Sequence, residues 1–282
     1  MKIVVTGGSG MLGTDIVKRF TGKHEVIGLS FKDMDITGEE ATRSRIREIR
    51  PDILIHTAAF TQVDACESDR DGAFRVNEAG TRHVALAALD VGARLVAIST
   101  DYVYDGKKRS PYVEGDPTSP LGVYGLSKLK GEKQIEDLLE NFLIIRTSWL
   151  FGHHGANFVK TILRIAGEQK TLRVVDDQRG SPTYTPDLAD AIFRLLQTPA
   201  RGIVHVSNSG TCTWWDYAVK IIQLSGREGI SVLPISTAEA GRPAPRPANS
   251  VLDNGRYQAL TGHTLRPWEE ALTDYMKFVS FQ

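Results

Sequence analysis

A tyrosine and a lysine, Tyr124 and Lys128, stand four residues apart in the stretch "VYGLSK". On a helix, this spacing places both side chains on one face. A phenol normally titrates near pH ~10, and an ammonium group beside it favours the ionised form, so the pair is suited to donating a proton near neutral pH. The same spacing also occurs by chance on solvated helices. The pair alone therefore does not show whether it is catalytic or accidental.

A glycine-rich loop follows the first apolar run of the chain. The stretch "VVTGGSGMLGTD" carries Gly7, Gly10 and Gly13 between a strand expected at 2–6 and a helix expected from Met11. Glycines at this spacing let backbone amides approach a pyrophosphate at a helix N-terminus, and Met11 and Leu12 would lie beside it. The alternative is an ordinary glycine-rich turn. A Walker phosphate loop is disfavoured, because no Gly-Lys-Ser/Thr follows.

The end of the second strand normally selects between NAD and NADP. Here that strand ends at Ser30, with no acid at its end to bind the ribose hydroxyls, which favours NADPH. Asp33 and Asp35 follow closely, so NADH stays possible. We expect Asp35 and Ile36 to lie under the adenine ring.

Composition narrows the class of protein. The chain has 282 residues, and its 34 Lys and Arg balance 34 Asp and Glu, so bulk charge points to neither a nucleic acid nor a membrane surface as partner. The two cysteines form no disulfide framework, and no apolar run is long enough for a transmembrane helix. The first residues resemble a strand and not a signal peptide. A cytoplasmic protein is expected.

Continuously apolar strands joined by helices predict an α/β fold with a doubly wound, Rossmann-like parallel sheet. The expected strands are 2–6, 25–30, 52–58, 93–100 and 142–148, and the expected helices are 11–20, 39–50, 72–91 and 125–139. We therefore assign residues 1–150 to a dinucleotide-binding domain. Residues 151–282 are assigned to a smaller substrate-binding lobe, whose segments are free to cross back. It includes a proline-rich loop at 240–250 and a terminal helix at 267–279.

Taken together, the glycine loop and the Tyr124/Lys128 pair resemble the extended short-chain dehydrogenase/reductase family. The resemblance covers nearly the whole chain and narrows to the dTDP-4-dehydrorhamnose reductases. It is carried by the stretches "HTAAFTQVDACE", "RVNEAGT", "STDYVYDG", "RTSWLFG", "DDQRGSPTYTPDLA" and "RPANSVLD". It implies NADPH-dependent reduction of the 4-keto group of dTDP-4-dehydro-6-deoxy-L-mannose to dTDP-L-rhamnose.

The resemblance also implies roles for individual residues. Tyr124 would protonate the ketone oxygen, Lys128 would lower the tyrosine's pKa and bind the nicotinamide ribose, and Thr100 would hydrogen-bond the substrate carbonyl. Ser99 is the alternative hydroxyl in the same strand. Asp101 would contact substrate or cap a turn.

Further positions lie on the stretches that carry the resemblance. Trp149 would flank the sugar, although such a residue is more often core. Ala58 and Ala59 would let the cofactor pass the third strand. Asn77 would support the site or serve as a buried structural amide.

The proline-rich loop carries two arginines. Arg242 and Arg246 would bind the substrate's diphosphate, since guanidinium pairs bidentately with phosphate, or lie as solvated loop residues.

Two other functions stay open. One is another nucleotide-sugar reductase or epimerase with the same core. The other is a non-catalytic NADP-binding subunit, like the regulatory subunit of methionine adenosyltransferase, which has a similar sequence. We expect no metal, because the histidine pair at 153–154 is a weak ligand pattern. A homodimer is possible.

Overall fold

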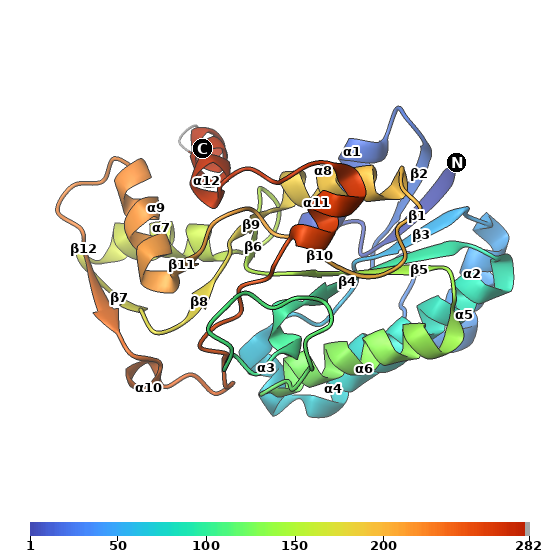
Figure 1. Cartoon of the computed structure of the whole chain (residues 1–282), viewed down its shortest axis with the longest axis horizontal. Helices are drawn as coiled ribbons and strands as arrows, with labels where there is room; N and C mark the ends of the chain where they lie inside the picture. The colour runs from blue at the N-terminus through green and yellow to red at the C-terminus, as the bar shows by residue number, and fades with distance from the viewer. Residues whose placement is uncertain (280–282) are drawn as a thin grey trace.

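Six parallel strands form the central sheet of the protein, in a computed structural model that describes residues 1–279 (Figure 1). Their order across the sheet is β10-β5-β4-β3-β1-β2, and every neighbouring pair is parallel. The strands are β1 (Lys2–Thr6), β2 (Glu25–Leu29), β3 (Ile53–His56), β4 (Arg94–Thr100), β5 (Phe142–Thr147) and β10 (Gly202–His205). The predicted fold class is confirmed.

Helices cover both faces of this sheet (Figure 1). One layer comprises α1 (Met11–Phe20), α8 (Thr185–Leu196) and α11 (Gly255–Thr261). The other comprises α2 (Glu39–Ile49), α5 (Thr81–Val91) and α6 (Val123–Leu138). The strand centres are continuously apolar because side chains on both faces of the sheet meet a helical layer, whereas polar residues lie at the strand ends.

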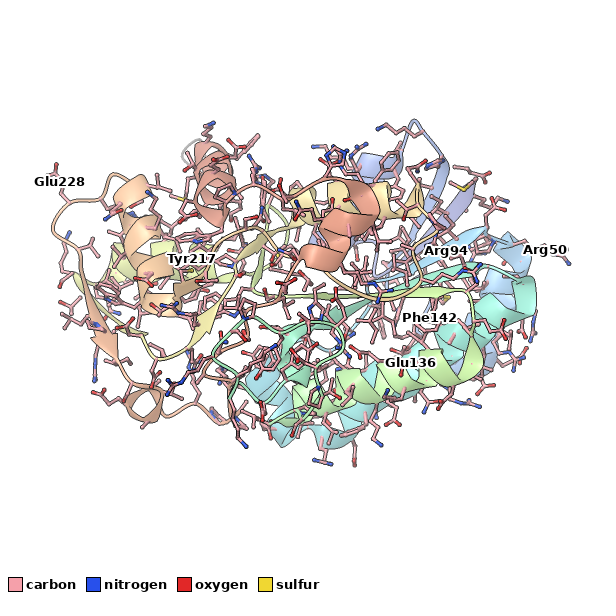
Figure 2. The ribbon with its side chains drawn as sticks, in the orientation of Figure 1. Arg50, Arg94, Glu136, Phe142, Tyr217 and Glu228 are labelled. Atoms are coloured by element: carbon pink, nitrogen blue, oxygen red, sulfur yellow. The ribbon has the colours of Figure 1, made fainter. Side chains whose placement is uncertain are left out.

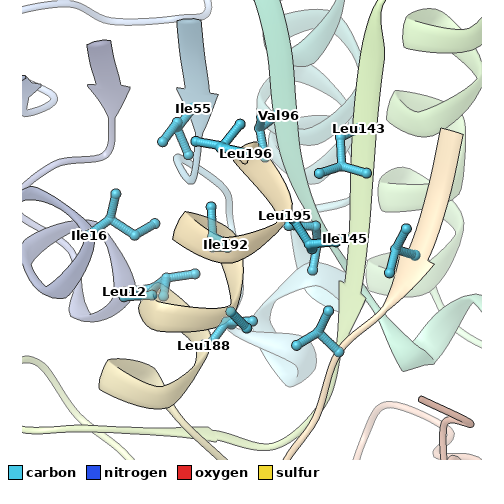
Figure 3. Packing of buried hydrophobic residues seen from close by; sticks show 14 of the residues in the cluster. Leu12, Ile16, Ile55, Val96, Leu143, Ile145, Leu188, Ile192, Leu195 and Leu196 are labelled. Carbon is cyan, nitrogen blue, oxygen red and sulfur yellow. The ribbon is translucent and has the colours of Figure 1, made fainter. Parts of the chain in front are cut away.

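The two cores on either side of the sheet show this alternation. Ile3 and Val5 of β1 pack into the cluster under α1 and α8, whereas Val4 packs into the cluster under α2 and α5. Figure 3 shows the first cluster, in which apolar side chains of α8 meet those of α1 and of the central strands. The side chains labelled there include Leu12, Ile16, Ile55, Val96, Leu143, Leu188, Ile192 and Leu195.

A smaller lobe lies beyond the carboxyl edge of the sheet, at the left of Figure 1. Its core joins aromatic and aliphatic side chains of three helices, α7 (Phe158–Glu168), α9 (Trp214–Leu224) and α12 (Trp268–Val279). Three two-stranded pairings complete it: β7 (Thr171–Val175) with β12 (Ser231–Ile235), β8 (Arg179–Gly180) with β11 (Cys212–Thr213), and β6 (Leu150–Phe151) with β9 (Thr183–Tyr184). In Figure 2, Tyr217 lies within this lobe, whereas Arg94 and Phe142, at the starts of β4 and β5, lie at the far end of the sheet.

The chain visits the lobe in more than one passage. After β9 it returns to the central sheet as α8 and β10, and α11 later packs against the same face. The division into domains 1–150 and 151–282 stays a prediction, and its residues 280–282 lie outside the described part of the chain. Within residues 1–279, no helix is both long and apolar enough to cross a membrane.

The helix expected over 72–91 is present, and it contains a wider turn. The structure has α4 (Arg70–Phe74), a π-helical turn at Arg75–Gly80, and then α5. The wider turn contains Asn77, whose side-chain amide is bound to the main chain of Phe60. The local pattern of apolar residues does not show a tertiary contact of this kind. The sequence therefore predicted the helix but not its wider turn.

We predict that Gly13→Ala destabilises the protein. A Cβ at Gly13 would lie 2.1 Å from the carbonyl oxygen of Gly7, so the loop and α1 would have to separate. Such overpacking typically costs about 1–3 kcal/mol of the free energy of unfolding, measurable by urea denaturation. Gly115→Ala is the matched control, because nothing lies within 4 Å of its added methyl group. Equal denaturation midpoints for the two variants would contradict the prediction.

Candidate active site

A cavity of about 720 Å³ opens at the carboxyl edge of the central sheet. Loops that follow β1, β3, β4 and β5 line it, together with the start of α6 and residues of the small lobe. Parallel sheets present their carboxyl ends to ligands because the strand-to-helix loops meet there. The volume lies within the range of small-molecule and cofactor sites.

The glycine loop forms one end of this cavity. Gly7 has a φ of +69°, and a Cβ there would lie 2.7 Å from the amide nitrogen of Ala58. Gly10 precedes α1 without a side-chain cap, so the first amides of the helix depend on a ligand or solvent for their hydrogen bonds. Gly10, Met11 and Leu12 all line the cavity. This arrangement fits a pyrophosphate at a helix N-terminus.

Gly13 does not line the cavity and instead permits the close approach of α1 to Gly7. Ala58 and Ala59, which follow β3, do line it. Their small side chains leave room beside the glycine loop. Gly13 was one of five loop residues expected to contact the cofactor. In the structure it packs against Gly7 and supports the loop.

The expected adenosine end is lined by residues that follow β2. Asp35 and Ile36 lie there as expected, whereas Ser30 is not among the lining residues. The Ser30 backbone N–H and hydroxyl instead donate to Asp33 Oδ2, at 2.8 and 2.6 Å. Phe31 lines the cavity with three quarters of its surface exposed, a position that the sequence pattern did not indicate. A contact between Ser30 and the cofactor stays a prediction.

Tyr124, Thr100 and Lys128 meet at the other end of the cavity. The Tyr124 ring is partly exposed to the cavity. Loss of hydration at the phenol raises its pKa above the usual value, and a hydrogen bond with Thr100 opposes this rise. Lys128 is buried, and its Nζ donates to the carbonyl oxygen of Ile98 at 2.7 Å. The expectation of a lowered Tyr124 pKa is not met in the protein alone, because burial raises it, and an effect of Lys128 on this pKa stays a prediction. A raised pKa keeps the proton on the phenol until negative charge develops on a nearby acceptor oxygen.

Alternation along β4 separates Ser99 from Thr100. The Ser99 hydroxyl donates to Glu132, below the cavity wall. The Thr100 hydroxyl donates to Asp101 Oδ1 at 3.0 Å and accepts from the Tyr102 amide at 3.2 Å. Of the two hydroxyls, Thr100 is the one beside Tyr124.

Asp101 is a buried acid with one oxygen unengaged. It is 1% exposed, and its Oδ2 has no hydrogen-bond partner among the described residues. Burial raises its pKa to about 7, although hydrogen bonds from Ser250 and Thr100 favour the charged form. A carboxyl group in this state can donate to or accept from a substrate hydroxyl.

Trp149 forms a wall of the cavity together with Trp214. The two indole rings stack with centroids 3.5 Å apart and planes 7° apart. On the other side of the ring, a Cβ at Gly180 would lie 2.4 Å from Trp149 Cε2. Trp149 also has a φ of +47°, which is unusual for a residue with a side chain. Trp214 was not expected in the site; its only signal was an aromatic pair at the start of a helix.

The two arginines of the proline-rich loop do not line the cavity. Arg246 Nη2 contacts both carboxylate oxygens of Asp64 at 3.0 Å, and Arg242 Nη1 lies 3.6 Å from the same carboxylate. Arg246 also bonds the side chain of Tyr102, which does line the cavity. Their contact with a substrate diphosphate stays a prediction, and Asp64 is the group with which such a ligand would compete.

Asn77 joins the cofactor end of the cavity to the helix that carries Tyr124. Its side chain accepts from the amide of Phe60 at 2.8 Å and donates to Ser127 Oγ at 3.0 Å. Ser127 in turn donates to the carbonyl oxygen of Tyr124 at 2.9 Å. Residues 1–279 contain no group of three or more His, Cys, Asp or Glu side chains arranged to hold a metal ion.

A protein-family model described as the RmlD substrate binding domain matches residues 1–280. The chain belongs to this family. Among the relatives, the spore coat polysaccharide biosynthesis protein SpsK of Bacillus subtilis is 44% identical over 98% of this chain and 97% of its own. The dTDP-4-keto-6-deoxy-D-glucose reductase of Streptomyces niveus is 38% identical over 96% of this chain and 94% of its own.

Solved structures agree with the whole architecture. A dTDP-4-dehydrorhamnose reductase from Clostridium acetobutylicum superposes with a TM-score of 0.96 at 41% identity, covering 99% of each chain. That of Bacillus anthracis, solved in complex with NADP, has a TM-score of 0.94 at 39% identity and covers 98% of this chain and 99% of its own. The resemblance stated from the sequence is confirmed.

We predict that Asp101→Asn changes the pH dependence of stability. Because the folded-state pKa is raised to about 7, Asp101 stabilises the fold while protonated, and this contribution is lost as the pH rises from about 4 through 7. The variant should therefore gain about 2–3 kcal/mol of stability relative to wild type between pH 5 and pH 7.5, because the rest of the effect falls below pH 5. Thermal unfolding at the two pH values measures it. A constant difference in melting temperature would contradict the prediction.

Proposed function

We propose that the protein reduces the 4-keto group of dTDP-4-dehydro-6-deoxy-L-mannose to dTDP-L-rhamnose, using NADPH. One observation carries the proposal: the hydroxyls of Tyr124 and Thr100 meet at one end of a single cavity whose other end is the uncapped glycine loop. Membership of the family and the names of its relatives support the substrate. NADH stays possible as an alternative cofactor.

The nicotinamide cofactor, when bound, supplies the hydride. Gly7, Gly10 and the first amides of α1 would hold its pyrophosphate, and Asp35 and Ile36 would lie against its adenosine. Lys128 would bind its nicotinamide ribose. These residues position the reacting atoms in a partly closed cavity, which removes much of the entropic barrier.

Tyr124 and Thr100 act on the ketone oxygen of the substrate. Tyr124 holds its proton in the resting protein, because burial raises its pKa. It transfers that proton to the oxygen as negative charge develops there, and the Thr100 hydroxyl stabilises the same charge by a hydrogen bond. Asp101 and Trp149, which also line the cavity, would orient the sugar ring.

A spectrophotometric assay of NADPH oxidation tests the proposal. Oxidation that requires dTDP-4-dehydro-6-deoxy-L-mannose supports it. The second candidate is reduction of dTDP-4-keto-6-deoxy-D-glucose, the substrate that names the Streptomyces niveus relative. A higher kcat/KM for that sugar would replace our assignment. Binding of NADPH without oxidation by either sugar would instead favour the regulatory subunit.

We predict that Tyr124→Phe lowers kcat by about 100-fold or more, the scale expected for losing a general acid. NADPH affinity should change little, because the ring and its packing are retained. Tyr102→Phe is the matched control: Tyr102 also lines the cavity, with its ring 5.6 Å from that of Tyr124, and its loss of a hydroxyl should leave kcat within a few-fold of wild type. Near-normal turnover of Tyr124→Phe would overturn the assignment.

We predict that Arg246→Gln raises the KM for the sugar nucleotide about ten- to a hundredfold, since a charge-assisted hydrogen bond contributes about 1.5–3 kcal/mol. Asp64→Asn breaks the same ion pair but leaves the guanidinium available, so it should not raise this KM. Steady-state kinetics and melting temperatures of both variants decide the matter. If both variants lose stability equally and keep the wild-type KM, the role of Arg246 is only to hold the proline-rich loop against Asp64.

A further inference from the structure

A fully buried ion pair lies beneath the catalytic end of the cavity. Glu132 of α6 and Arg146 of β5 are each 3% exposed, and Arg146 donates through Nε and Nη2 to the two carboxylate oxygens of Glu132, at 3.0 and 2.6 Å. The Ser99 hydroxyl of β4 donates to the same carboxylate. These three hydrogen bonds come from buried donors and fix the orientation of the carboxylate.

The guanidinium is held in place from its far side. Arg146 Nη1 donates to the Tyr104 hydroxyl at 2.8 Å. His205 is neutral, because burial lowers its pKa to about 3, and its Nδ1 lies 3.0 Å from the carbonyl oxygen of Tyr112, so Nδ1 carries the proton. The Tyr104 hydroxyl therefore donates to His205 Nε2, 2.9 Å away. A buried ion pair of this kind is weak evidence for stability, since apolar residues often replace such pairs without loss.

The position of Glu132 relative to Lys128 indicates another role. The two residues are four apart on α6, which places them on one face of the helix. Two consecutive residues of β4 hold them: the Ile98 carbonyl accepts from Lys128, and the Ser99 hydroxyl donates to Glu132. Lys128 and Glu132 also line one small cavity of about 10 Å³, roughly the space of a single water molecule.

Other ionisable groups surround Lys128 from every neighbouring element. His56 of β3 is neutral, because burial and the charge of Lys128 lower its pKa to about 3. Asp101, after β4, has its pKa raised to about 7 by burial, and Tyr124 on α6 keeps its proton. Arg146 on β5 is cationic and is paired with Glu132. Burial lowers the pKa of Lys128 itself to about 8, and the charge of Glu132 opposes this shift.

We propose that Glu132, held by Arg146 and Ser99, is a positioning residue that acts through its charge and keeps Lys128 cationic. The inference rests on the proposed function, because it takes from it the role of Lys128. It adds that the ion pair below the site sets the upper limit of pH at which the enzyme works.

Glu132→Gln tests the proposal, since it keeps the shape of the side chain and removes its charge. Without that charge Lys128 loses its proton at lower pH, so the alkaline limb of the kcat/KM profile should move down by about one pH unit or more. Activity should stay close to wild type at pH 6.5 and fall about five- to tenfold below it at pH 8.5. Glu132→Asp is the matched control, because it keeps the charge and should keep the wild-type limb. A loss for Glu132→Gln that is equal at every pH would overturn the proposal.

Arg146 becomes an unpaired buried charge in Glu132→Gln, which threatens folding. The double variant Glu132→Gln/Arg146→Met removes both charges and takes over the test if the single variant does not fold. It should show a smaller downward movement of the alkaline limb, because the positive charge of Arg146 is removed together with the negative charge of Glu132. An unmoved limb in this variant, with normal circular dichroism, would also overturn the proposal.

Lys128→Met separates this inference from the proposed function. If Lys128 has its assigned role, this variant loses most activity and weakens NADPH binding, measured by cofactor fluorescence. If Lys128→Met works normally, the assignment of Lys128 fails and the proposal about Glu132 fails with it. If Lys128→Met is inactive while Glu132→Gln keeps the wild-type pH profile, only the proposal about Glu132 is wrong.

Discussion

Burial of ionisable groups at the carboxyl edge of the parallel sheet is the constraint on which the site depends. A parallel sheet covered by helices on both faces has a dry interior, and its strand ends lead directly from that interior into the cavity. Groups placed there lose their hydration, which disfavours their charged forms. The opposite shifts of Lys128 and Asp101 are two consequences of this one cause: the pKa of the amine falls and that of the acid rises.

The same constraint explains why several polar side chains near the site hydrogen-bond one another. Asn77, His56 and Thr81 form a connected set, in which His56 contacts Thr6 at 2.8 Å and Thr81 at 3.1 Å, and Thr81 donates to the carbonyl oxygen of Asn77 at 2.7 Å. A buried donor or acceptor left unpaired costs about 1–3 kcal/mol, so such a network fixes the loops that carry it. Beside it, Asp101 Oδ2 and Thr147 Oγ1, both of residues that line the cavity, are buried atoms with no hydrogen-bond partner among the described residues.

Much of this arrangement follows from patterns in the sequence. The apolar runs predicted the parallel sheet, and the glycine loop and Tyr124/Lys128 spacing predicted the two ends of one cavity, because parallel strands bring their carboxyl ends to one edge. Contacts between distant segments were not predictable in this way. The pairing of Arg246 with Asp64 spans 182 residues, and the stacking of Trp214 on Trp149 joins two separate passages of the chain. The pKa of Tyr124 was misjudged for a related reason: local spacing shows the lysine but not the crowding around the phenol.

Trp149 connects the chemistry of the sheet edge to the position of the small lobe. It directly follows Ser148, whose hydroxyl donates to the carbonyl oxygen of Ser181 at 2.7 Å, and its own carbonyl accepts from the amide of Thr183 at 3.2 Å. These bonds tie the exit of β5 to the strand pairing that begins the lobe. A left-handed backbone at a bulky residue costs about 1–3 kcal/mol and persists only where surrounding contacts enforce it. Here Gly180 and Trp214 enforce it, and both belong to the small lobe. The cavity wall and the joint between sheet and lobe are therefore formed by the same residues, so a shift of the lobe would reshape this wall of the cavity.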